Sequence, residues 1–220
     1  MWQTTLTVGR SVEGRAIGAY VFRGIPKRTV LILGGFHGDE PKSVFVARRW
    51  IDLLRNERDP VDGPRWVVVP LVNPDGYAKR QRRNARRVDI NRNFPTKNWM
   101  PTSPQTRMYG GPTPASEPET QAVMAVVRRF RPMRIMTIHS IGLDRHCNNY
   151  DGPGRALALA MRRYNHYPVT ASIGYPTPGS FGTWAGGERN ITTITLELPS
   201  RHSPKRCWDD NRRALLCLAR

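Results

Sequence analysis

The sequence predicts an α/β fold: a twisted, mixed and largely parallel sheet with helices on both faces. Short runs rich in β-branched and aromatic residues alternate along the chain with longer amphipathic segments, which is the pattern of strands joined by crossover helices. The length of 220 residues suits one compact α/β unit. Neither an internal repeat nor a low-complexity linker divides residues 1–220, so we expect a single domain.

Strands and helices are expected in alternation along the chain. Five strands are predicted at residues 17–22, 30–33, 66–72, 135–138 and 191–196. Four helices are predicted at residues 41–54, 117–130, 154–164 and 205–218. Ser116 and Glu119 have the spacing of a capping box, which marks the start of the second helix. Residues 73–118 lack apolar periodicity and are rich in Asn, Pro, Gly, Thr and Arg, which predicts an ordered loop that carries a functional site.

The chain is strongly basic, with 35 lysine and arginine residues against 17 acidic ones and a net charge of +18. Such a charge is compatible with a nucleic-acid-binding protein. The arginines are nevertheless spread over the whole length, with clusters only at residues 80–87 and 128–134, and no zinc-finger, RNP or KH pattern occurs. We therefore expect no specific nucleic-acid partner, and a basic nucleic-acid-binding protein stays as the alternative from another class.

Cysteine content and hydropathy indicate the compartment. Cys147, Cys207 and Cys217 are odd in number and lack CxxC spacing, which argues against a disulfide framework and against a thiolate metal site. No stretch of 18 apolar residues occurs, so no membrane span is expected, and residues 1–5 lack the features of a secretion signal. A cytoplasmic location is therefore expected, while the oligomeric state stays open.

His37 and Glu40 are the first candidate metal ligands. His37 follows the apolar run 30–33 and a glycine pair, so it is expected at the carboxyl end of a strand, with Glu40 in the first turn of the helix that Pro41 begins. Ligands bind at that edge of an open α/β sheet. Nitrogen and oxygen ligands suit Zn²⁺. By itself, however, the pattern is explained as well by a turn histidine and a helix-capping glutamate.

A third ligand is required, because a catalytic zinc takes three protein ligands and keeps one position for water. His139 directly follows the apolar run 134–138, so it too is expected at the end of a buried strand. The alternative is a core histidine that is satisfied by hydrogen bonds. The remaining candidates, His146, His166 and His202, lie in polar or loop contexts, which makes His139 the best third ligand.

Glu197 is the candidate general base. It ends the predicted strand 191–196 and lies between Leu196 and Leu198. Such a glutamate is either a surface charge at a strand end or a desolvated base. Burial raises the pKa of a carboxylate toward the operating pH, as a general base requires. Beside a zinc ion it could take the proton of metal-bound water and pass it to the leaving amine.

The segment 73–118 carries the longest signal. It contains Asn73-Pro74-Asp75-Gly76-Tyr77, then Arg82-Arg83-Asn84, then Val88-Asp89-Ile90-Asn91-Arg92-Asn93-Phe94-Pro95. With the blocks His37-x-x-Glu40, His139-Ser140 and Glu197-Leu198 in this order and spacing, the chain resembles the zinc carboxypeptidases of the carboxypeptidase A type. The resemblance covers roughly residues 31–199 and implies a carboxypeptidase-like fold.

The resemblance implies a role for each matching residue. His37, Glu40 and His139 would hold one Zn²⁺ per chain, and Glu197 would be the general base. Arg82 would polarise the scissile carbonyl and stabilise its oxyanion, since fixed positive charge helps where negative charge develops.

Three more residues match the substrate side of the family pattern. Asn91 and Arg92 would bind the free carboxylate of a small peptide substrate, because a guanidinium pairs a carboxylate with two charge-assisted hydrogen bonds. Asp89 would be the carboxylate that orients the first zinc histidine. On composition alone Arg82 and Arg92 would be solvated surface residues, but the residues beside them match the family pattern as well.

Within the family, the run at residues 175–184 and the short length are similar to the bacterial murein peptide amidases. That similarity implies a cytoplasmic enzyme of peptidoglycan recycling, which cuts the γ-D-glutamyl–meso-diaminopimelate bond of the murein peptide L-Ala-γ-D-Glu-meso-diaminopimelate. One alternative is a metallocarboxypeptidase that acts on ordinary peptides. Another is an N-acyl amino acid deacylase of the succinylglutamate desuccinylase or aspartoacylase type, against which Asn73 to Gly76 and Leu198-Pro199 speak.

The sequence departs from the family pattern at three places. Arg87 stands where a glycine is usual, and Ile141 stands where the animal enzymes have a tyrosine. Ala185 and Gly186 occupy the place where the proton-donating tyrosine of those enzymes is expected. Tyr175 is the candidate substitute for that tyrosine.

Overall fold

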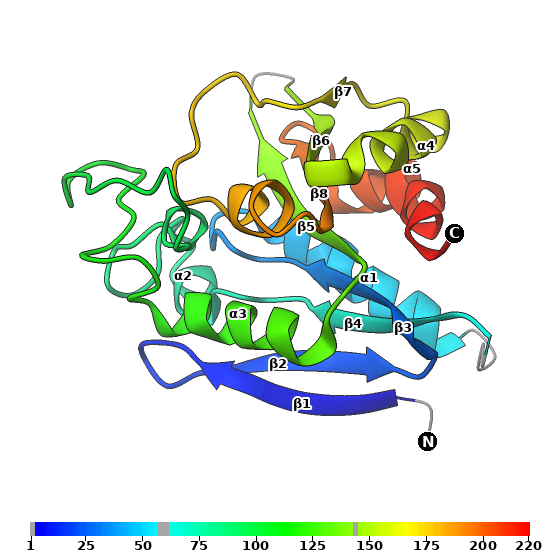
Figure 1. Ribbon diagram of the computed structural model, residues 1–220, viewed down its shortest axis with the longest axis horizontal. Coiled ribbons are helices and arrows are strands. Elements are labelled where there is room, and N and C mark those ends of the chain that lie inside the picture. Colours follow the sequence, from blue (N-terminus) through cyan, green and yellow to red (C-terminus); the bar gives the residue numbers. More distant parts are fainter. Residues whose placement is uncertain (1–2, 57–61, 143–144) are drawn as a thin grey trace.

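The computed structural model describes residues 3–56, 62–142 and 145–220, and its strands form one eight-stranded sheet (Figure 1). The strands are β1 (Gln3–Arg10), β2 (Ala16–Phe22), β3 (Ile25–Leu33), β4 (Pro64–Val69), β5 (Arg134–Ile141), β6 (Cys147–Asp151), β7 (Val169–Thr170) and β8 (Thr192–Pro199). Their order in the sheet is β1-β2-β4-β3-β5-β8-β6-β7. The four central strands, β4, β3, β5 and β8, run parallel, whereas the pairs β1/β2, β2/β4 and β6/β8 are antiparallel. The predicted mixed, largely parallel sheet is confirmed.

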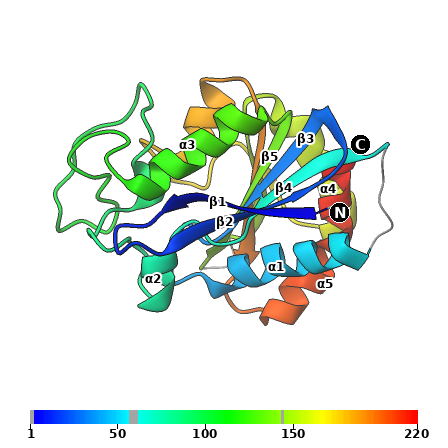
Figure 2. The ribbon, with the colours of Figure 1, turned by 90° about the horizontal axis from the view of Figure 1, so that it is seen from below.

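Helices cover both faces of this sheet. They are α1 (Pro41–Asn56), α2 (Pro74–Ala78), α3 (Pro118–Phe130), α4 (Arg155–Asn165) and α5 (Pro204–Leu215). Helices α1, α4 and α5 pack on one face, and α3 packs on the other together with the π-helical turn η3 (Thr183–Gly187). Figure 2 shows α3 and α1 on opposite sides of the strands. Within the described residues, no helix has the length and apolar character that a bilayer crossing requires.

Two hydrophobic clusters fill the space between sheet and helices. The first, under α1, α4 and α5, is centred on Trp50, which packs edge-on against Trp66 with ring centroids 4.9 Å apart. The second lies on the α3 side and contains Phe36, Phe94 and Phe181. Edge and tilted ring contacts of this kind add to the free energy of burial. The second cluster also forms the floor of the site described below.

The predicted elements correspond to β2, β3, β4, β5 and β8 and to α1, α3, α4 and α5, with shifts at their ends. The strand predicted at 66–72 ends at Val69, and the last helix ends at Leu215, where a 3-10 turn continues the chain. Strands β1, β6 and β7 were not predicted. The edge strand β1 is largely exposed, β6 is made of polar residues, and β7 has two residues, so none has the apolar pattern of a core strand.

The predicted capping box at the start of α3 is wrong. Glu117 is the N-cap residue, and no side-chain hydrogen bond caps the helix. Ser116 Oγ instead donates to Glu117 Oε1 at 2.8 Å. The Glu119 carboxylate accepts from Val12 N at 3.1 Å and from Asn84 Nδ2 at 3.0 Å. For Glu119, long-range partners have therefore replaced the local one.

Residues 73–118 form the ordered loop that the sequence predicted. Asn73 Oδ1 accepts from Gly76 N at 2.9 Å, and Asn73 Nδ2 donates to Phe36 O at 3.2 Å. The loop also meets the turn after β3, because a Cβ on Gly38 would lie only 2.0 Å from the carbonyl carbon of Gly76. The two segments touch through their main chains, because neither glycine has a side chain. The loop is therefore fixed against the turn that carries His37.

Arg87 gives a test of backbone strain in this loop. Its φ of 63° lies in the left-handed region, which favours glycine, and its side chain is exposed. Arg87→Gly is expected to have a free energy of unfolding about 1 kcal/mol higher than Arg87→Ala, since both variants lose the side chain and only alanine keeps the strain. Denaturant titration of the two variants measures the difference, and an Arg87→Ala variant as stable as Arg87→Gly would contradict it.

Candidate active site

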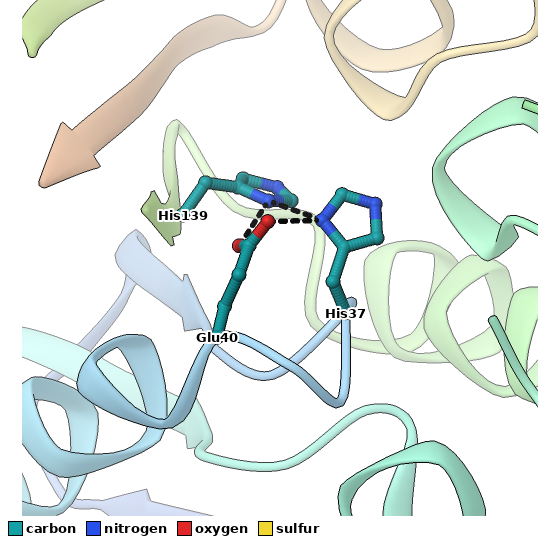
Figure 3. A group of neighbouring side chains, drawn as sticks. All are labelled: His37, Glu40 and His139. Carbon is teal, nitrogen blue, oxygen red and sulfur yellow. Dashed lines mark hydrogen bonds and ion pairs between the residues drawn. The ribbon is translucent and has the colours of Figure 1, made fainter. Parts of the chain in front are cut away.

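His37, Glu40 and His139 converge at the carboxyl edge of the sheet. His37 Nδ1 lies 2.7 Å from Glu40 Oε1, and His139 Nδ1 lies 3.1 Å from Glu40 Oε2 and 3.2 Å from His37 Nδ1. Figure 3 shows the three polar groups pointing at one another, with the second ring nitrogen of His37 turned away. Each residue offers one ligand atom, and these atoms lie within 4.8 Å of one another. In the described part of the chain, no other group of histidine, cysteine and acidic side chains converges in this way.

The local fold explains this convergence. Strand β3 ends at Leu33, and the turn that follows carries His37 and Glu40 before α1 begins at Pro41. Glu40 therefore precedes the helix by one residue, whereas the sequence predicted it in the first turn. His139 comes from the adjacent parallel strand β5. Since parallel strands end at the same edge, the two segments meet there.

The donor set fits Zn²⁺. His37 Nε2 lies 3.0 Å from Asp89 Oδ1, which accepts its proton and so assigns the lone pair to Nδ1 in the neutral ring. That lone pair is aimed at the Glu40 carboxylate, which is also an acceptor. Two nitrogens and one carboxylate are the ligands of many catalytic zinc sites, which keep an open position for water. Asp89 is placed as a carboxylate that orients a zinc histidine.

Burial and mutual charge set the protonation of this cluster. Burial alone would raise the pKa of Glu40, yet the adjoining His37 and His139 hold it well below its ordinary value. Burial would also raise the pKa of Asp89, but interactions with His37 and Arg82 lower it well below the usual range. Burial lowers the pKa of His139. Ionised carboxylates and a neutral imidazole are the forms that bind a metal ion.

Arg82 lies against the metal side of the site. Its Nε and Nη2 atoms are each 3.0 Å from Asp89 Oδ2, and Nη1 is 3.5 Å from Glu40 Oε1. Burial would lower the pKa of Arg82, but Asp89 and Glu40 raise it, so the guanidinium stays charged. A fixed positive charge therefore lies beside the metal ligands, where the sequence predicted one.

Asn91 and Arg92 follow Asp89 on the 3-10 turn η1 (Ile90–Arg92). Asn91 Oδ1 accepts from Phe181 N at 2.9 Å, which leaves Asn91 Nδ2 facing His139 Nε2 at 3.5 Å. Arg92 is 4% exposed, and its Nη1 donates to Asn91 O at 2.6 Å. Its buried Nε atom has no hydrogen-bond partner among the described residues. A buried guanidinium with a free donor is suited to bind an anionic ligand.

Glu197 lies on β8 directly beside His139 in the β5/β8 register. It is 6% exposed, and burial together with the charge of Glu40 raises its pKa to about 8. A carboxylate with a raised pKa in an active-site cavity is a candidate acid or base.

All of the predicted site residues except Asp89 line one cavity of about 600 Å³. Ile141 and Tyr175 line it as well, so Tyr175 keeps its place as a candidate proton donor. The sequence did not reveal the backbone donors of Ser140, whose N–H binds Glu40 Oε2 at 3.1 Å, and of Phe181. Backbone groups give no residue-type signal. It also did not reveal Asp151, which lies on the polar strand β6.

Comparison with known families agrees with this geometry. The model of the zinc carboxypeptidase family matches residues 3–144, which include all three candidate metal ligands. The fold and the donor set define a zinc-dependent hydrolase. The chain belongs to the zinc carboxypeptidase family, and it is a zinc metallohydrolase.

Individual relatives refine this picture. The chain is similar to murein peptide amidase A of Escherichia coli K12, with 34% identity over 202 residues that cover 87% of this chain and 79% of the relative. The crystal structure of murein-tripeptide amidase MpaA from Escherichia coli O157 has a TM-score of 0.78 at 29% identity and covers 98% of this chain and 92% of its own. Carboxypeptidase A of Helicoverpa armigera has a TM-score of 0.83 at 19% identity, covering 98% of this chain and 67% of its own, and shares the fold.

The ligand set predicts a metal content of about one zinc per chain after reconstitution, measured by elemental analysis. His37→Ala and His139→Ala should each lose most of the bound zinc in a chelator competition. Asp89→Asn should weaken binding by about 10- to 100-fold, because the carboxylate only orients a ligand. His202→Ala, outside the cluster, serves as the control. Zinc bound as tightly by His139→Ala as by the parent would show that the ligand set is wrong.

The raised pKa of Glu197 predicts how stability depends on pH in the metal-free protein. A carboxyl group whose pKa is about 8 when folded and about 4.3 when unfolded opposes folding increasingly above pH 4.3 and up to pH 8. Glu197→Gln should therefore leave the melting temperature unchanged near pH 4 and raise it at pH 7. The corresponding gain in the free energy of unfolding at pH 7 is on the order of 3 kcal/mol.

Thermal melts of the metal-free proteins from pH 4 to pH 8 measure this effect. Glu188→Gln, which changes an exposed glutamate, controls for the loss of one charge. If Glu197→Gln raised the melting temperature equally at all pH values, Glu197 would not be a buried, desolvated carboxyl group.

Proposed function

We propose that this enzyme is a murein peptide amidase that hydrolyses the γ-D-glutamyl–meso-diaminopimelate bond of L-Ala-γ-D-Glu-meso-diaminopimelate. The observation that carries the proposal is one cavity lined by the candidate metal ligands, by the buried Glu197 and by Arg92, whose Nε has no hydrogen-bond partner among the described residues. The relatives named murein peptide amidase A support the choice of substrate. A role in peptidoglycan recycling follows from that substrate.

Hydrolysis requires a base, an acid and stabilisation of the oxyanion. Zn²⁺, when bound, supplies a Lewis acid that polarises the scissile carbonyl and makes water more acidic. Glu197 takes a proton from the attacking water and returns it to the leaving amine, a use supported by its burial beside His139. A nearby cation favours the ionised form of Glu197, which the first of these steps requires. The Arg82 guanidinium stabilises the negative charge that develops on the carbonyl oxygen.

Asn91 and Arg92 hold the α-carboxylate of the residue that is released. This role is supported because Asn91 and Arg92 both line the cavity, where Asn91 Nδ2 faces His139 Nε2. The enzyme thus removes a terminal residue and leaves internal peptide bonds intact.

The buried, free thiols of Cys147, Cys207 and Cys217 support a reducing, cytoplasmic location. We also propose that residues 1–220 form one catalytic domain, since both core clusters share one sheet.

The substrate prediction is tested by mass spectrometry of the products formed from L-Ala-γ-D-Glu-meso-diaminopimelate, which should be L-Ala-D-Glu and diaminopimelate. Converting the α-carboxylate of the released residue to an amide should lower kcat/KM by about 100-fold or more, because a desolvated Arg92 then faces a neutral group. Arg92→Gln should lower kcat/KM for the tripeptide with the free α-carboxylate. It should also reduce the difference in kcat/KM between this substrate and its amide.

Glu197→Gln is the control for chemistry, and it should keep zinc while losing roughly two or more orders of magnitude in kcat. Equal kcat/KM for the tripeptide and its amide would show that Arg92 does not bind the α-carboxylate. Preference for an ordinary L-peptide that ends in lysine or phenylalanine would overturn the murein assignment and leave a zinc carboxypeptidase.

A further inference from the structure

Helices α4 and α5 form one continuous surface on the side of the sheet opposite to α3. The two helices pack against each other, and Asn165 Nδ2 donates to Asn211 Oδ1 at 3.0 Å between them (Figure 1). The chain continues from α5 into the 3-10 turn η4 (Leu216–Ala219). Arg220, which follows η4, donates from Nη1 to Tyr164 Oη of α4 at 3.3 Å. The end of α5 and the turn η4 therefore lie beside α4.

The exposed positions of this surface are basic. We call it the arginine surface and define it by five exposed residues, Arg155, Arg162 and Arg163 on α4 and Arg212 and Arg213 on α5. Helix α4 contains no acidic residue. The two acidic residues of α5, Asp209 and Asp210, pair with Lys205 and Arg206 in the preceding turn. None of the five arginines forms an ion pair with a described acidic residue, so their charge is available to a ligand.

Apolar side chains are exposed among these arginines. Leu159 on α4 is 39% exposed, and Leu216 at the start of η4 is 40% exposed. Residues three or four positions apart are neighbours on a helix surface. Leu159 therefore adjoins all three arginines of α4, and Leu216 adjoins both arginines of α5. With Tyr164, three of the six large apolar side chains that are exposed among the described residues lie on this one surface.

The arginines of α4 and the turn η4 lie close together and away from the active site. Burial raises the pKa of the Cys217 thiol in η4, and the charges of Arg220 and Arg163 act against this rise. Arg163 is therefore near the turn that carries Leu216. None of these residues lines the active-site cavity. A ligand on the arginine surface would thus contact a part of the molecule that the chemistry does not use.

We propose that the arginine surface binds the headgroup region of a bilayer that contains anionic phospholipids. Each basic residue near an anionic membrane adds to binding, and apolar side chains on the same surface enter the boundary between headgroups and acyl chains. A nucleic acid would also attract the arginines through its phosphates. Leu159 and Leu216, however, gain free energy by leaving water for an apolar phase, which a phosphate backbone does not provide. The leucines therefore favour the bilayer.

Sedimentation of the protein with lipid vesicles tests the proposal, at about 150 mM salt so that charges far from the bilayer are screened. The probes are vesicles of phosphatidylcholine alone and vesicles that also contain phosphatidylglycerol. The parent protein is expected to bind the anionic vesicles at least about tenfold more tightly. The double variant Arg162→Gln/Arg163→Gln should bind them roughly 10- to 30-fold more weakly than the parent, because two basic residues leave the membrane surface.

Two further variants separate the surface from net charge and from nucleic-acid binding. Arg128→Gln/Arg129→Gln removes the same charge from two exposed residues at the end of α3, on the other face of the sheet, and should bind vesicles as the parent does. Leu159→Gln/Leu216→Gln should weaken binding to anionic vesicles by about tenfold. The same leucine variant should bind single-stranded RNA as the parent does, since RNA contacts use the arginines.

Equal binding of the parent protein to both kinds of vesicle would overturn the proposal, and so would an equal loss of binding in the α3 variant. A leucine variant that binds vesicles as tightly as the parent would also overturn it, because the surface would then recognise phosphate alone. The melting temperature reports folding in each variant, and the single substitutions Arg163→Gln and Leu159→Gln replace a double variant that does not fold. Activity on a soluble peptide should be unchanged in all of them.

Discussion

One buried carboxylate, that of Asp89, joins the metal side of the active site to its substrate side. Oδ1 accepts from His37 Nε2 and from Asn91 N, both at 3.0 Å, and Oδ2 accepts from Arg82 Nε. A single side chain thus contacts the candidate metal ligand His37, Arg82 and the turn that carries Asn91 and Arg92. Its burial makes these bonds strong, and the surrounding positive charge keeps it ionised.

The sheet supplies the other constraint. Strands β3, β5 and β8 are parallel neighbours, so their carboxyl ends lie at one edge and bring His37, His139 and Glu197 together from distant parts of the sequence. The register places His139 and Glu197 side by side. The ring of Phe36 stacks on that of His139 with centroids 5.5 Å apart, which connects the site to the aromatic cluster below it.

Much of this arrangement could be predicted from the sequence, because the apolar runs before His37 and His139 and at Glu197 identify strands that end in functional groups. The sequence also predicted the ordered loop that carries Arg82 and Asn91. It did not predict β6, because that strand has no apolar pattern, and two of its residues, Asn149 and Asp151, line the cavity. Asp151 was missed for the same reason. The capping box failed because both of its side chains have other partners. Ser116 bonds to Glu117 and Asn93, and Glu119 bonds to Val12 and Asn84.

The contact between Gly38 and Gly76 limits how such a sequence can diverge. A Cβ on Gly38 would meet the main chain of Gly76 and Tyr77, so no larger residue is tolerated at Gly38 while Gly76 keeps its place. The turn that carries His37 and the loop 73–118 therefore constrain each other near this contact. Changes in loop length are expected in the mostly exposed segment 97–106, which lies outside the lining of the cavity.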